Sequence, residues 1–357
     1  MSKAGPLVTF ALLAYNQEKY IRDAVEAALS QTYSPLEIIF SDDHSSDGTF
    51  QIMRKIALDY RGPHRIVLNR NGLTLGLGAH VNLVNRLATG ELVVAAAGDD
   101  ISFAKRVERL VQIWIETDKP SALSSQASVI DAAGMTVYPR FRGYEGFQPM
   151  PSDDRQNCLR RLIKDDHCIL LGCTEAWQRS LFETFGDLAA GVVHEDNAMA
   201  FRAWLVDGVG YLDDVLVAYR VHDRNLALQK PKVYRSIEDF KLREVDNSRR
   251  SKRRGFHLAQ HREDLIVARA KNLIGESEFR EISKLLSLRI QENDAISCWW
   301  DASISGRLKT FAIAIGHLNS RLILWCAVRL GGLATYSFIR AHLGGLSRKL
   351  RGLSGKG

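Results

Sequence analysis

The feature that most constrains the fold is a regular alternation of short apolar runs and longer helical patterns over residues 1–130. The apolar runs lie at residues 7–13, 36–40, 65–69 and 91–97. Between them are amphipathic segments of ten or more residues, such as IRDAVEAALSQ at residues 21–31. Strands that alternate with helices are typical of βαβ units and of a mostly parallel sheet. The sequence therefore predicts an open α/β sheet flanked by helices.

Three loops follow the predicted strands, and two of them are rich in carboxylates. They read AYNQEKY after the first strand, SDDHSSDGT after the second and GDDIS after the fourth. In open α/β sheets, ligands bind beyond the carboxyl ends of the strands. Adjacent carboxylates repel one another, so the pairs Asp42/Asp43 and Asp99/Asp100 must be solvated, bonded to different partners or neutralised by a cation.

Each acidic loop also has a simpler interpretation as a turn that caps a helix, because Asp and Ser accept hydrogen bonds from free backbone N–H groups. We prefer this interpretation for Asp47 and Ser102, which precede helical patterns. For the two aspartate pairs, a shared sheet edge favours a hard divalent cation, Mg²⁺ or Mn²⁺, with positions left for phosphate oxygens. The sequence thus predicts a metal–diphosphate site.

Composition indicates a folded globular protein without cysteine chemistry. Of 357 residues, 46% are hydrophobic and 25% are charged, which is typical of globular domains. The five cysteines include no C-x-x-C pair, so we expect reduced thiols and neither a zinc site nor a disulfide framework. The apolar N-terminal stretch has no small-residue cleavage site, so we expect no signal peptide and a chain that begins inside the cell.

Charge and pattern divide the chain near residue 230. Residues 1–230 carry 24 Lys and Arg against 29 Asp and Glu, whereas residues 231–357 carry 24 against 12. We predict a catalytic domain over 1–230, with a donor half at 1–130 and an acceptor half at 131–230. The remaining residues, 231–357, are predicted to form a basic helical region.

Within the acceptor half, residues 131–165 are rich in Gly, Pro and aromatic residues and have no clear period, which predicts a long loop. The segment TEAWQRSLFETFG, which begins at Thr174, has a helical pattern. The segment VGYLDDVLVAYRVH, which ends at His222, has the pattern of a strand.

Residues 12–49 resemble the opening of glycosyltransferase family 2. They read LLAYNQEKYIRDAVEAALSQTYSPLEIIFSDDHSSDGT, similar to the family's strand, Y-N, helix and D-D-x-S-x-D-x-T order. The resemblance continues through NGLTLGLGAHVNLVNRLATGELVVAAAGDD and HEDNAMAFR and fades after YRVHDRN. Several ordered motifs are more specific than any one of them. The resemblance implies a GT-A fold and transfer of a sugar from a nucleotide donor.

The resemblance implies a role for each matching position at the donor end. Asp42 and Asp43 would lie by the base and ribose of the sugar nucleotide. The same pocket would be lined by Ala14, Tyr15 and Asn16.

The resemblance also implies a metal site with one departure from the family pattern. Asp99 would hold the metal that bridges the diphosphate, and His222 would approach the metal or the phosphates. The family motif usually reads D-x-D-D, whereas this chain has alanine, Gly98, Asp99 and Asp100. A missing carboxylate predicts weaker metal affinity, with more of the coordination from phosphate and water. Asp100 is the less secure second ligand, and Gly98 is counted with the donor-binding residues.

The acid element HED would supply the catalytic base. Asp196 would take the proton of the acceptor hydroxyl, Glu195 would raise its pKa, and Arg202 on the same helix would lower it. Mn²⁺ or Mg²⁺ would act as a Lewis acid on the leaving diphosphate. Attack from the opposite face of the sugar resembles other single displacements, so inversion at the anomeric carbon is expected.

Other residues have both a functional and a structural interpretation. Thr174 and Glu175 are expected to contact the acceptor, whereas the aromatic residues Trp177 and Phe182 have the spacing of core residues. His194 fits either a substrate contact or an exposed structural role. The DDH run at residues 165–167 is expected to be a solvated or acceptor-side loop, because no matching metal-ligand spacing follows it.

The end of the chain suggests a membrane surface. After Asp301 there are nine Lys and Arg and no acidic residue. A full span needs ~20 apolar residues, and Arg329 interrupts the best candidate. Because Arg329, Arg340 and Arg351 recur every eleven residues, we predict a surface helix on an anionic leaflet. Packing on the catalytic domain is the alternative.

Two functions of other classes remain open from the residues alone. The run RRSKRR at residues 249–254 could mark a nucleic-acid-binding or membrane-binding protein without enzymatic activity, although no nucleic-acid module accompanies it. A nucleotidyltransferase could use the same metal-binding carboxylates, but it would not need the acid element near residue 195.

We therefore predict an inverting glycosyltransferase that is cytoplasmic and peripheral at the inner face of a bacterial membrane. A role in cell-surface polysaccharide or glycolipid synthesis is inferred from the resemblance. A UDP-sugar is the expected donor, with GDP- and dTDP-sugars as alternatives, and the acceptor is expected to be a carbohydrate or lipid-linked hydroxyl. Nucleic acid is not an expected partner.

Overall fold

The computed structural model describes residues 5–141, 155–165, 170–223, 225, 237–299, 305, 307 and 326. These residues divide into two compact units. The first contains the described residues within 1–233 and 253–289, and the second contains those within 234–252 and 290–357. Residues 253–289, which we expected in a separate C-terminal region, are therefore part of the first unit.

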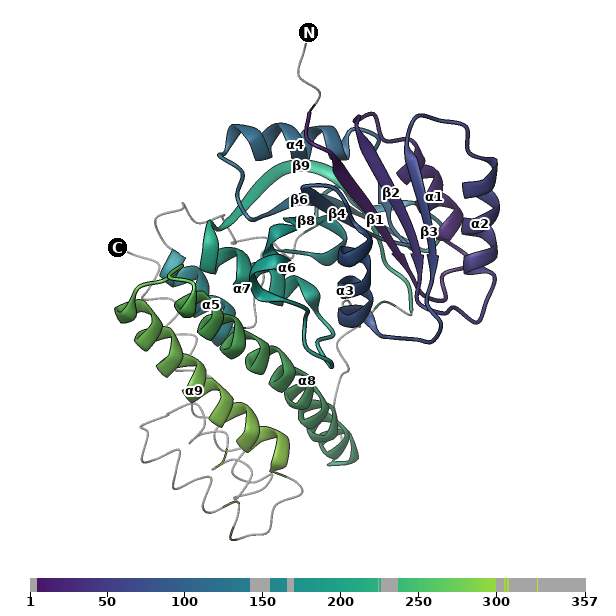
Figure 1. Cartoon of the computed structure of the whole chain (residues 1–357). Helices are drawn as coiled ribbons and strands as arrows, with labels where there is room; N and C mark the ends of the chain where they lie inside the picture. The colour runs from purple at the N-terminus through teal and green to yellow at the C-terminus, as the bar shows by residue number, and fades with distance from the viewer. Residues whose placement is uncertain are drawn as a thin grey trace. The chain divides into compact units, whose positions relative to one another are not determined.

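The first unit is built on a sheet in which nine strands are described (Figure 1). The strand order is β3-β2-β1-β4-β8-β6-β9-β5, and β7 pairs with β6. The strands are β1 Val8–Ala14, β2 Leu36–Asp42, β3 Arg65–Arg70, β4 Leu92–Ala97, β5 Ile101–Ser102, β6 Ala122–Ile130, β7 Thr136–Tyr138, β8 Glu175–Gln178 and β9 Val209–Arg220. The helices are α1 Ile21–Leu29, α2 Thr49–Asp59, α3 Leu77–Leu87, α4 Arg106–Glu116, α5 Arg155–Asp165, α6 Ser180–Phe185, α7 Glu195–Val206, α8 Ile237–Ala270 and α9 Glu276–Cys298, with a 3₁₀ turn at Gly172–Thr174.

Strands β1 to β4 form the parallel half of the sheet that the sequence predicted. Val8 of β1 lies opposite Leu36 of β2 and Leu92 of β4, and all three side chains are buried. Strands with near-continuous apolar residues suit a parallel sheet whose two faces are both covered. The predicted α/β sheet is thus confirmed, and the carboxyl ends of β1, β2 and β4 carry the three predicted loops.

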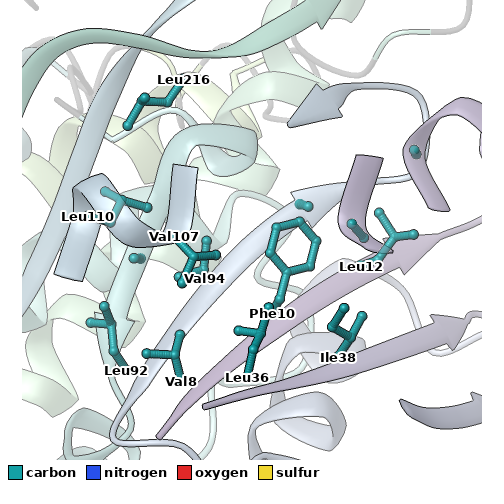
Figure 2. Close-up of a cluster of buried hydrophobic side chains, with 14 of the residues drawn as sticks. Val8, Phe10, Leu12, Leu36, Ile38, Leu92, Val94, Val107, Leu110 and Leu216 are labelled. Carbon is teal, nitrogen blue, oxygen red and sulfur yellow. The ribbon is translucent and has the colours of Figure 1, made fainter. Parts of the chain in front are cut away.

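The core lies where alternate strand residues meet α1 and α4 (Figure 2). Phe10, Ile38 and Val94 point to this face and pack with Leu110 of α4 and Leu216 of β9. Each of these side chains is buried, and such burial stabilises the fold by about 1.5–3 kcal/mol per side chain. Because successive strand residues face opposite sides, the intervening residues are left for the helices α3 and α7.

Strand β8 joins the two halves of the sheet. It runs antiparallel to both β4 and β6, whereas β6 and β9 are parallel. The prediction that this segment is helical was wrong for Glu175–Gln178, because the backbone groups of two flanking strands need a partner. Helix α6 begins only at Ser180. The strand predicted to end near His222 is confirmed as β9.

The helical pattern predicted after residue 229 is confirmed over residues 237–298 by α8 and α9. Arg155 of α5 pairs with Glu278 of α9 at 2.6 Å, and Arg160 pairs with Glu281. The first part of α9 therefore packs on α5 within the first unit. Within the described residues, no helix is both long enough and apolar enough to cross a bilayer.

Some predictions lie outside the described residues. They include the basic face at Arg329, Arg340 and Arg351, residues 142–154 of the predicted loop at 131–165, and the DDH run apart from Asp165. The described parts of that loop contain β7 and α5, so the prediction of a long loop was wrong for Thr136–Tyr138 and Arg155–Asp165. Four cysteines are described, and all four are free thiols: Cys158, Cys173, Cys298 and Cys326.

Candidate active site

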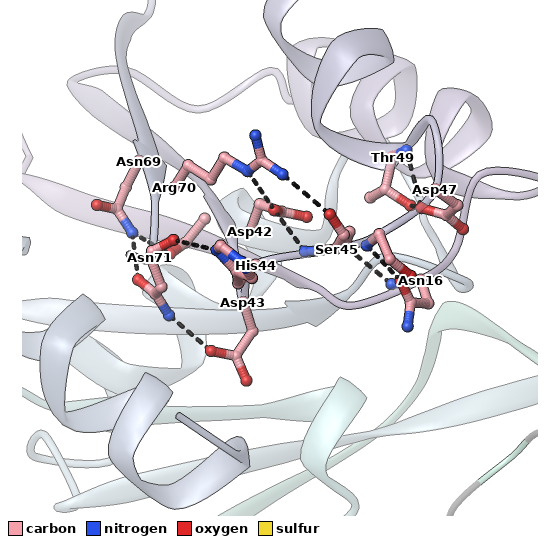
Figure 3. A network of polar contacts seen from close by, with 12 residues as sticks. Asn16, Asp42, Asp43, His44, Ser45, Asp47, Thr49, Asn69, Arg70 and Asn71 are labelled. Carbon is pink, nitrogen blue, oxygen red and sulfur yellow. Dashed lines mark hydrogen bonds and ion pairs between the residues drawn. The ribbon is translucent and has the colours of Figure 1, made fainter. Parts of the chain in front are cut away.

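The loop after β2 is anchored by Asp43 (Figure 3). Its Oδ1 accepts from the side-chain amide of Asn71 and from the N–H of Leu75, both at 2.8 Å. Its Oδ2 accepts from the N–H of Gly76 at 2.9 Å. Gly76 has φ 80°, a conformation that favours glycine. Asp43 is 3% exposed, so it fixes the loop between β3 and α3.

Asp42 lies beside Asp43 and accepts from different donors. Its Oδ2 accepts from the N–H of Ser45 at 2.9 Å and lies 3.5 Å from the Nε of Arg70. Its Oδ1 has no hydrogen-bond partner among the described residues. Each carboxylate of the pair thus has separate partners, which explains how adjacent negative charges are accommodated. Asp42 is fully buried, so neither oxygen is accessible to a ligand in this structure.

The loop after β1 lies next to this network. Ala14 is buried at the end of the strand, whereas Tyr15 is 49% exposed. Asn16 has φ 53°, which asparagine tolerates better than most residues. Its Oδ1 accepts from the N–H of Ser46 at 2.9 Å. The structure therefore brings the predicted donor-binding residues of the first two loops together.

Asp99 and His222 meet at the ends of β4 and β9. The Oδ2 of Asp99 lies 2.9 Å from the Nε2 of His222. The ring of His222 stacks on Tyr20, with the ring centroids 4.9 Å apart. These two side chains are 123 residues apart in the chain, and the sequence placed both in the same predicted metal site.

Asp100 points into the protein, which corrects its expected role as a metal ligand. It is 5% exposed, and its Oδ1 accepts from the N–H of Arg220 at 2.7 Å. It also forms a hydrogen bond with the thiol of Cys173. Burial, and then the charge of Asp99, raise the pKa of Asp100 well above its usual value. Gly98 is required by close packing, since a Cβ there would lie 2.5 Å from the Oε1 of Gln17.

Arg220 is a residue of the site that sequence reasoning missed. Its Nε donates to the backbone carbonyl of Asp99 at 2.8 Å, and its Nη2 pairs with Asp23 of α1 at 3.1 Å. The guanidinium also lies over the ring of Tyr20. Because Arg220 binds the backbone of Asp99 and its own N–H binds Asp100, it fixes the loop after β4. The only sequence signal was its place two residues before His222.

Asp99 and His222 fit a metal ion with few protein ligands. Among the described residues, no group of three or more His, Cys, Asp or Glu side chains is arranged to hold a metal. The 2.9 Å between the side-chain atoms of Asp99 and His222 is a hydrogen bond, which an ion bound to both residues would replace. Such an ion would take its other ligands from phosphate oxygens and water.

Three acidic side chains gather at the N-terminus of α7. Glu195 and Asp196 begin the helix, and Glu175 comes from β8. Asp196 is partly exposed, Glu195 is 8% exposed and Glu175 is fully buried. Neither carboxyl oxygen of Glu175 has a hydrogen-bond partner among the described residues. A buried carboxyl group without donors is most stable in its neutral form.

Burial raises the pKa values of all three acids, and repulsion between carboxylates adds to this effect for Glu195 and Glu175. Burial, and then the charge of Asp196, raise the pKa of Glu195 to about 8. Burial raises the pKa of Asp196, and the nearby His194 and backbone N–H groups partly offset this effect. Burial, and then Glu195 and Asp196, raise the pKa of Glu175 well above its usual value, against the opposing charge of Arg106. At neutral pH, Glu195 and Glu175 therefore hold protons more readily than Asp196.

The turn at Gly172–Thr174 connects the acid cluster to the loop after β4. Asp196 accepts a hydrogen bond from the N–H of Gly172, and the neighbouring Cys173 bonds to Asp100. Gly172 cannot be replaced without movement, because a Cβ there would lie 2.6 Å from the Oε1 of Glu195. The predicted base and the predicted metal motif thus lie on either side of one short turn.

Arg202 and Thr174 do not have the surroundings that the sequence suggested. Arg202 is fully buried and its Nε donates to Asp264 at 3.0 Å, so the cation that lowers the pKa of Asp196 is His194. Thr174 and Glu175 are both fully buried, and Thr174 bonds to Ser124 at 3.0 Å. Neither can contact an acceptor in this structure. The helical pattern of the sequence did not indicate that these side chains would be buried.

Comparisons of the sequence with known proteins agree with this site. Residues 9–171 match the family model described as Glycosyl transferase family 2. A protein of Bacillus subtilis strain 168 named as the glycosyltransferase EpsE is 33% identical over 149 residues, which cover 42% of this chain and 50% of the relative. An Escherichia coli protein, the UDP-Glc:alpha-D-GlcNAc-diphosphoundecaprenol beta-1,3-glucosyltransferase WfaP, is 33% identical over 113 residues, which cover 32% of this chain and 43% of the relative. The matches thus span half or less of these two relatives.

Solved structures with a similar fold have low sequence identity to this chain. S. aureus TarS 1-349 in complex with UDP aligns with a TM-score of 0.54 at 16% identity, covering 85% of this chain and 78% of that one. The mannosyltransferase PcManGT from Pyrobaculum calidifontis in complex with GDP-Man and Mn²⁺ aligns with a TM-score of 0.50 at 18% identity, covering 95% and 88%. At this identity the likeness concerns the fold, and it confirms the predicted GT-A architecture. The alternatives of a nucleotidyltransferase and a non-enzymatic binding protein are set aside by the family match and the relatives.

Proposed function

We propose that the chain is a glycosyltransferase that transfers a sugar from a nucleoside diphosphate sugar to an acceptor hydroxyl with inversion, using Asp196 as the general base. The match of residues 9–171 to the model of glycosyltransferase family 2 and the names of the similar proteins support this. One observation carries the proposal. Asp196, in the first turn of α7, is partly exposed and has a raised pKa. It accepts a hydrogen bond from the N–H of Gly172, and the next residue, Cys173, bonds to Asp100 of the metal motif.

The donor would bind across the carboxyl ends of β1, β2 and β4. The exposed ring of Tyr15 offers a surface for the base, and the fully buried Asp42 would hold the neighbouring loop in place through Ser45. The similarity to an E. coli protein named for UDP-Glc supports a UDP-sugar. Arg70, 38% exposed beside Asp42, would supply a positive charge near the same pocket.

The diphosphate would lie against Asp99 and His222, which contact each other and are a carboxylate and an imidazole, both of which can bind a divalent cation. A bound Mn²⁺ or Mg²⁺ would stabilise the charge that develops on the leaving diphosphate. Arg220 holds the backbone of Asp99 and would keep this carboxylate in place while the charge of its ligand changes.

On the opposite face of the sugar, Asp196 would remove the proton of the attacking hydroxyl. Its carboxylate already accepts from the N–H of Asn197 at 2.8 Å and from the N–H of Gly172, which fixes its orientation. Glu195 is the more buried of the two, and burial favours the neutral form, so the proton of the pair would reside on Glu195 near neutral pH. Asp196 would then be the ionised member that is available as a base.

The test uses hydrolysis of UDP-glucose with Mn²⁺ present, which needs no knowledge of the acceptor because water takes its place. Asp196→Asn should lower the turnover number by about 10²–10⁴-fold, while UDP still raises the melting temperature as it does for the unchanged protein. A variant that keeps near-normal turnover would refute the role of Asp196. A panel that adds UDP-GlcNAc, GDP-mannose and dTDP-rhamnose would identify the preferred donor.

Association with an anionic membrane and a lipid-linked acceptor belong to the same proposal. The exposed basic residues of α8 support it: Arg249, Arg250, Lys252 and Arg253. The name of the E. coli relative, which includes a diphosphoundecaprenol acceptor, also supports it. Co-sedimentation with vesicles of 30% phosphatidylglycerol, compared with neutral phosphatidylcholine vesicles, would test membrane binding.

A further inference from the structure

Helix α8 contacts the segment that carries the proposed catalytic base at several points. The contacts come from residues 256–264, which belong to the same compact unit as α7. His261 stacks on Phe201 of α7, with the ring centroids 4.1 Å apart. His257 stacks on His194, the residue before the acid pair, at 5.7 Å. A chain region that lies beyond the family match thus touches both ends of the acid-bearing segment.

The strongest of these contacts is a buried ion pair. The Nε of Arg202 on α7 donates to the Oδ2 of Asp264 on α8 at 3.0 Å, and the exposed fractions of the two side chains are 0% and 1%. The same guanidinium donates to the carbonyl of Gly186 at 2.8 Å, at the end of α6. Buried ion pairs need such additional hydrogen bonds, since both charges have left water. One arginine therefore holds α6, α7 and α8 together.

Gln260 extends this contact to the loop that leads into the acid pair. Its Nε2 donates to the Oδ1 of Asp264 at 2.9 Å, and its Oε1 accepts from the N–H of Ala189 at 2.6 Å. Phe256 packs against Gly191, where an added Cβ would lie 2.7 Å from its ring. The loop between α6 and α7 is therefore fixed to α8 five to seven residues before Asp196.

From these contacts we propose that α8 positions the catalytic base: Asp264 and Gln260, acting through Arg202 and the loop at Ala189, set the place and orientation of the N-terminus of α7. This rests on the proposed role of Asp196. Proton removal by a general base requires approach to within hydrogen-bonding distance of the attacking oxygen, and a shift of ~1 Å in a reacting group can lower a rate by about 10²-fold. Asp264 and Gln260 are thus positioning residues that contact no substrate themselves.

The test compares Asp264→Asn, Gln260→Met and the control Glu263→Gln in the full chain, again with UDP-glucose hydrolysis in Mn²⁺. Glu263 lies next to Asp264 on the exposed face and pairs with Arg262 at 3.6 Å. We expect both α8 variants to lower kcat, Asp264→Asn by about tenfold to a hundredfold and Gln260→Met by less, with KM for UDP-glucose and stabilisation by UDP within twofold of normal. The control should match the unchanged protein.

Gln260→Met keeps the proposal testable if Asp264→Asn fails to fold, because it leaves the ion pair in place. A folded Gln260→Met protein with normal kcat would overturn the proposal. So would a parallel loss of kcat, UDP binding and folded fraction, since that result indicates a purely structural role. Asp196→Asn measured beside them separates the two hypotheses: if that variant keeps its kcat, the proposed base fails, and if it alone loses kcat, only the positioning role fails.

Discussion

Asp43 and Glu175 are both buried carboxyl groups at the same sheet, yet they have opposite surroundings. Asp43 accepts three hydrogen bonds from Asn71, Leu75 and Gly76, whereas the two oxygens of Glu175 have no partner among the described residues. Burial without donors favours the neutral form of Glu175. Asp43 therefore anchors a loop through its hydrogen bonds, whereas the acids near α7 have raised pKa values because they are buried with few donors.

Asp47 shows how hydrogen-bond donors lower the pKa of a carboxyl group. Partial burial raises the pKa of Asp47, but hydrogen bonds from the hydroxyl and N–H of Thr49 and from the N–H of Glu18 outweigh this effect, so the pKa lies below its usual value. The pKa of Glu195 is raised to about 8. The pKa values of Asp47 and Glu195 are therefore shifted in opposite directions, and measurements at several pH values can detect the difference.

The largest expected effect distinguishes the two members of the acid pair. Glu195→Gln replaces a protonated carboxyl by a neutral side chain of similar shape, so hydrolysis of UDP-glucose should stay within about tenfold of normal. Asp196→Asn removes the ionised member and should cost about 10²–10⁴-fold. Turnover numbers at pH 7 check this order. The reverse order would make Glu195 the base and would break the assignment of the proton within the pair.

The second effect concerns the anchoring acid. Asp43→Ala leaves the buried side-chain amide of Asn71 and the partly buried N–H groups of Leu75 and Gly76 without an acceptor. A buried donor without a partner costs about 1–3 kcal/mol, whereas an accessible one can bond to water. We therefore expect a loss of about 1–3 kcal/mol in the free energy of unfolding, measured by urea denaturation. Asp59→Ala, at the exposed end of α2, serves as the control and should change stability by less than about 0.5 kcal/mol. A loss in Asp43→Ala no larger than in this control would mean that the network contributes little.

The third effect is the pH dependence of hydrolysis. A base must be ionised, so kcat/KM should fall as the pH falls through the pKa of Asp196, and this limb should lie above the usual range of an aspartate. Ionisation of Glu195 should appear as a second change near pH 8 that is lost in Glu195→Gln. Rates between pH 4 and 9 measure both limbs. An acidic limb in the ordinary aspartate range would show that Asp196 is not desolvated.

The smallest expected effect is a change in melting temperature when Glu175 is replaced. The pKa of Glu175 is higher in the folded protein than the ~4.3 of an unfolded chain. Its protonation therefore contributes fully to the free energy of unfolding below pH ~4.3, and this contribution is lost as the pH rises through the pKa of the folded protein. Glu175→Gln cannot ionise, so its melting temperature should exceed that of the unchanged protein by about 2–4 °C at pH 8 and match it at pH 4. The exposed Glu183, changed to Gln, should shift neither. A gain that does not depend on pH would contradict the neutral state of Glu175.

The sequence predicted what local patterns encode. Strands β1 to β4 and helices α1 to α4 follow from their periodicity, and Asp99 and His222 were placed together by the family resemblance. Glu175–Gln178 was taken as helical because its strand character comes from β4 and β6, which lie elsewhere in the chain. The partners of Arg202 and Arg220 were missed for the same reason: Asp264 is 62 residues from Arg202, and Asp99 is 121 residues from Arg220. No local period records such contacts.

The position of β8 has a consequence for how the protein can be divided. The family match ends at residue 171, just before this strand, yet β8 occupies the middle of the sheet between β4 and β6. A fragment cut at that point would expose the edges of two central strands, and such unpaired edges recruit other chains. The stretch recognised by similarity is therefore shorter than the smallest piece that should stay monomeric, and truncated versions for crystallisation should extend at least through α8.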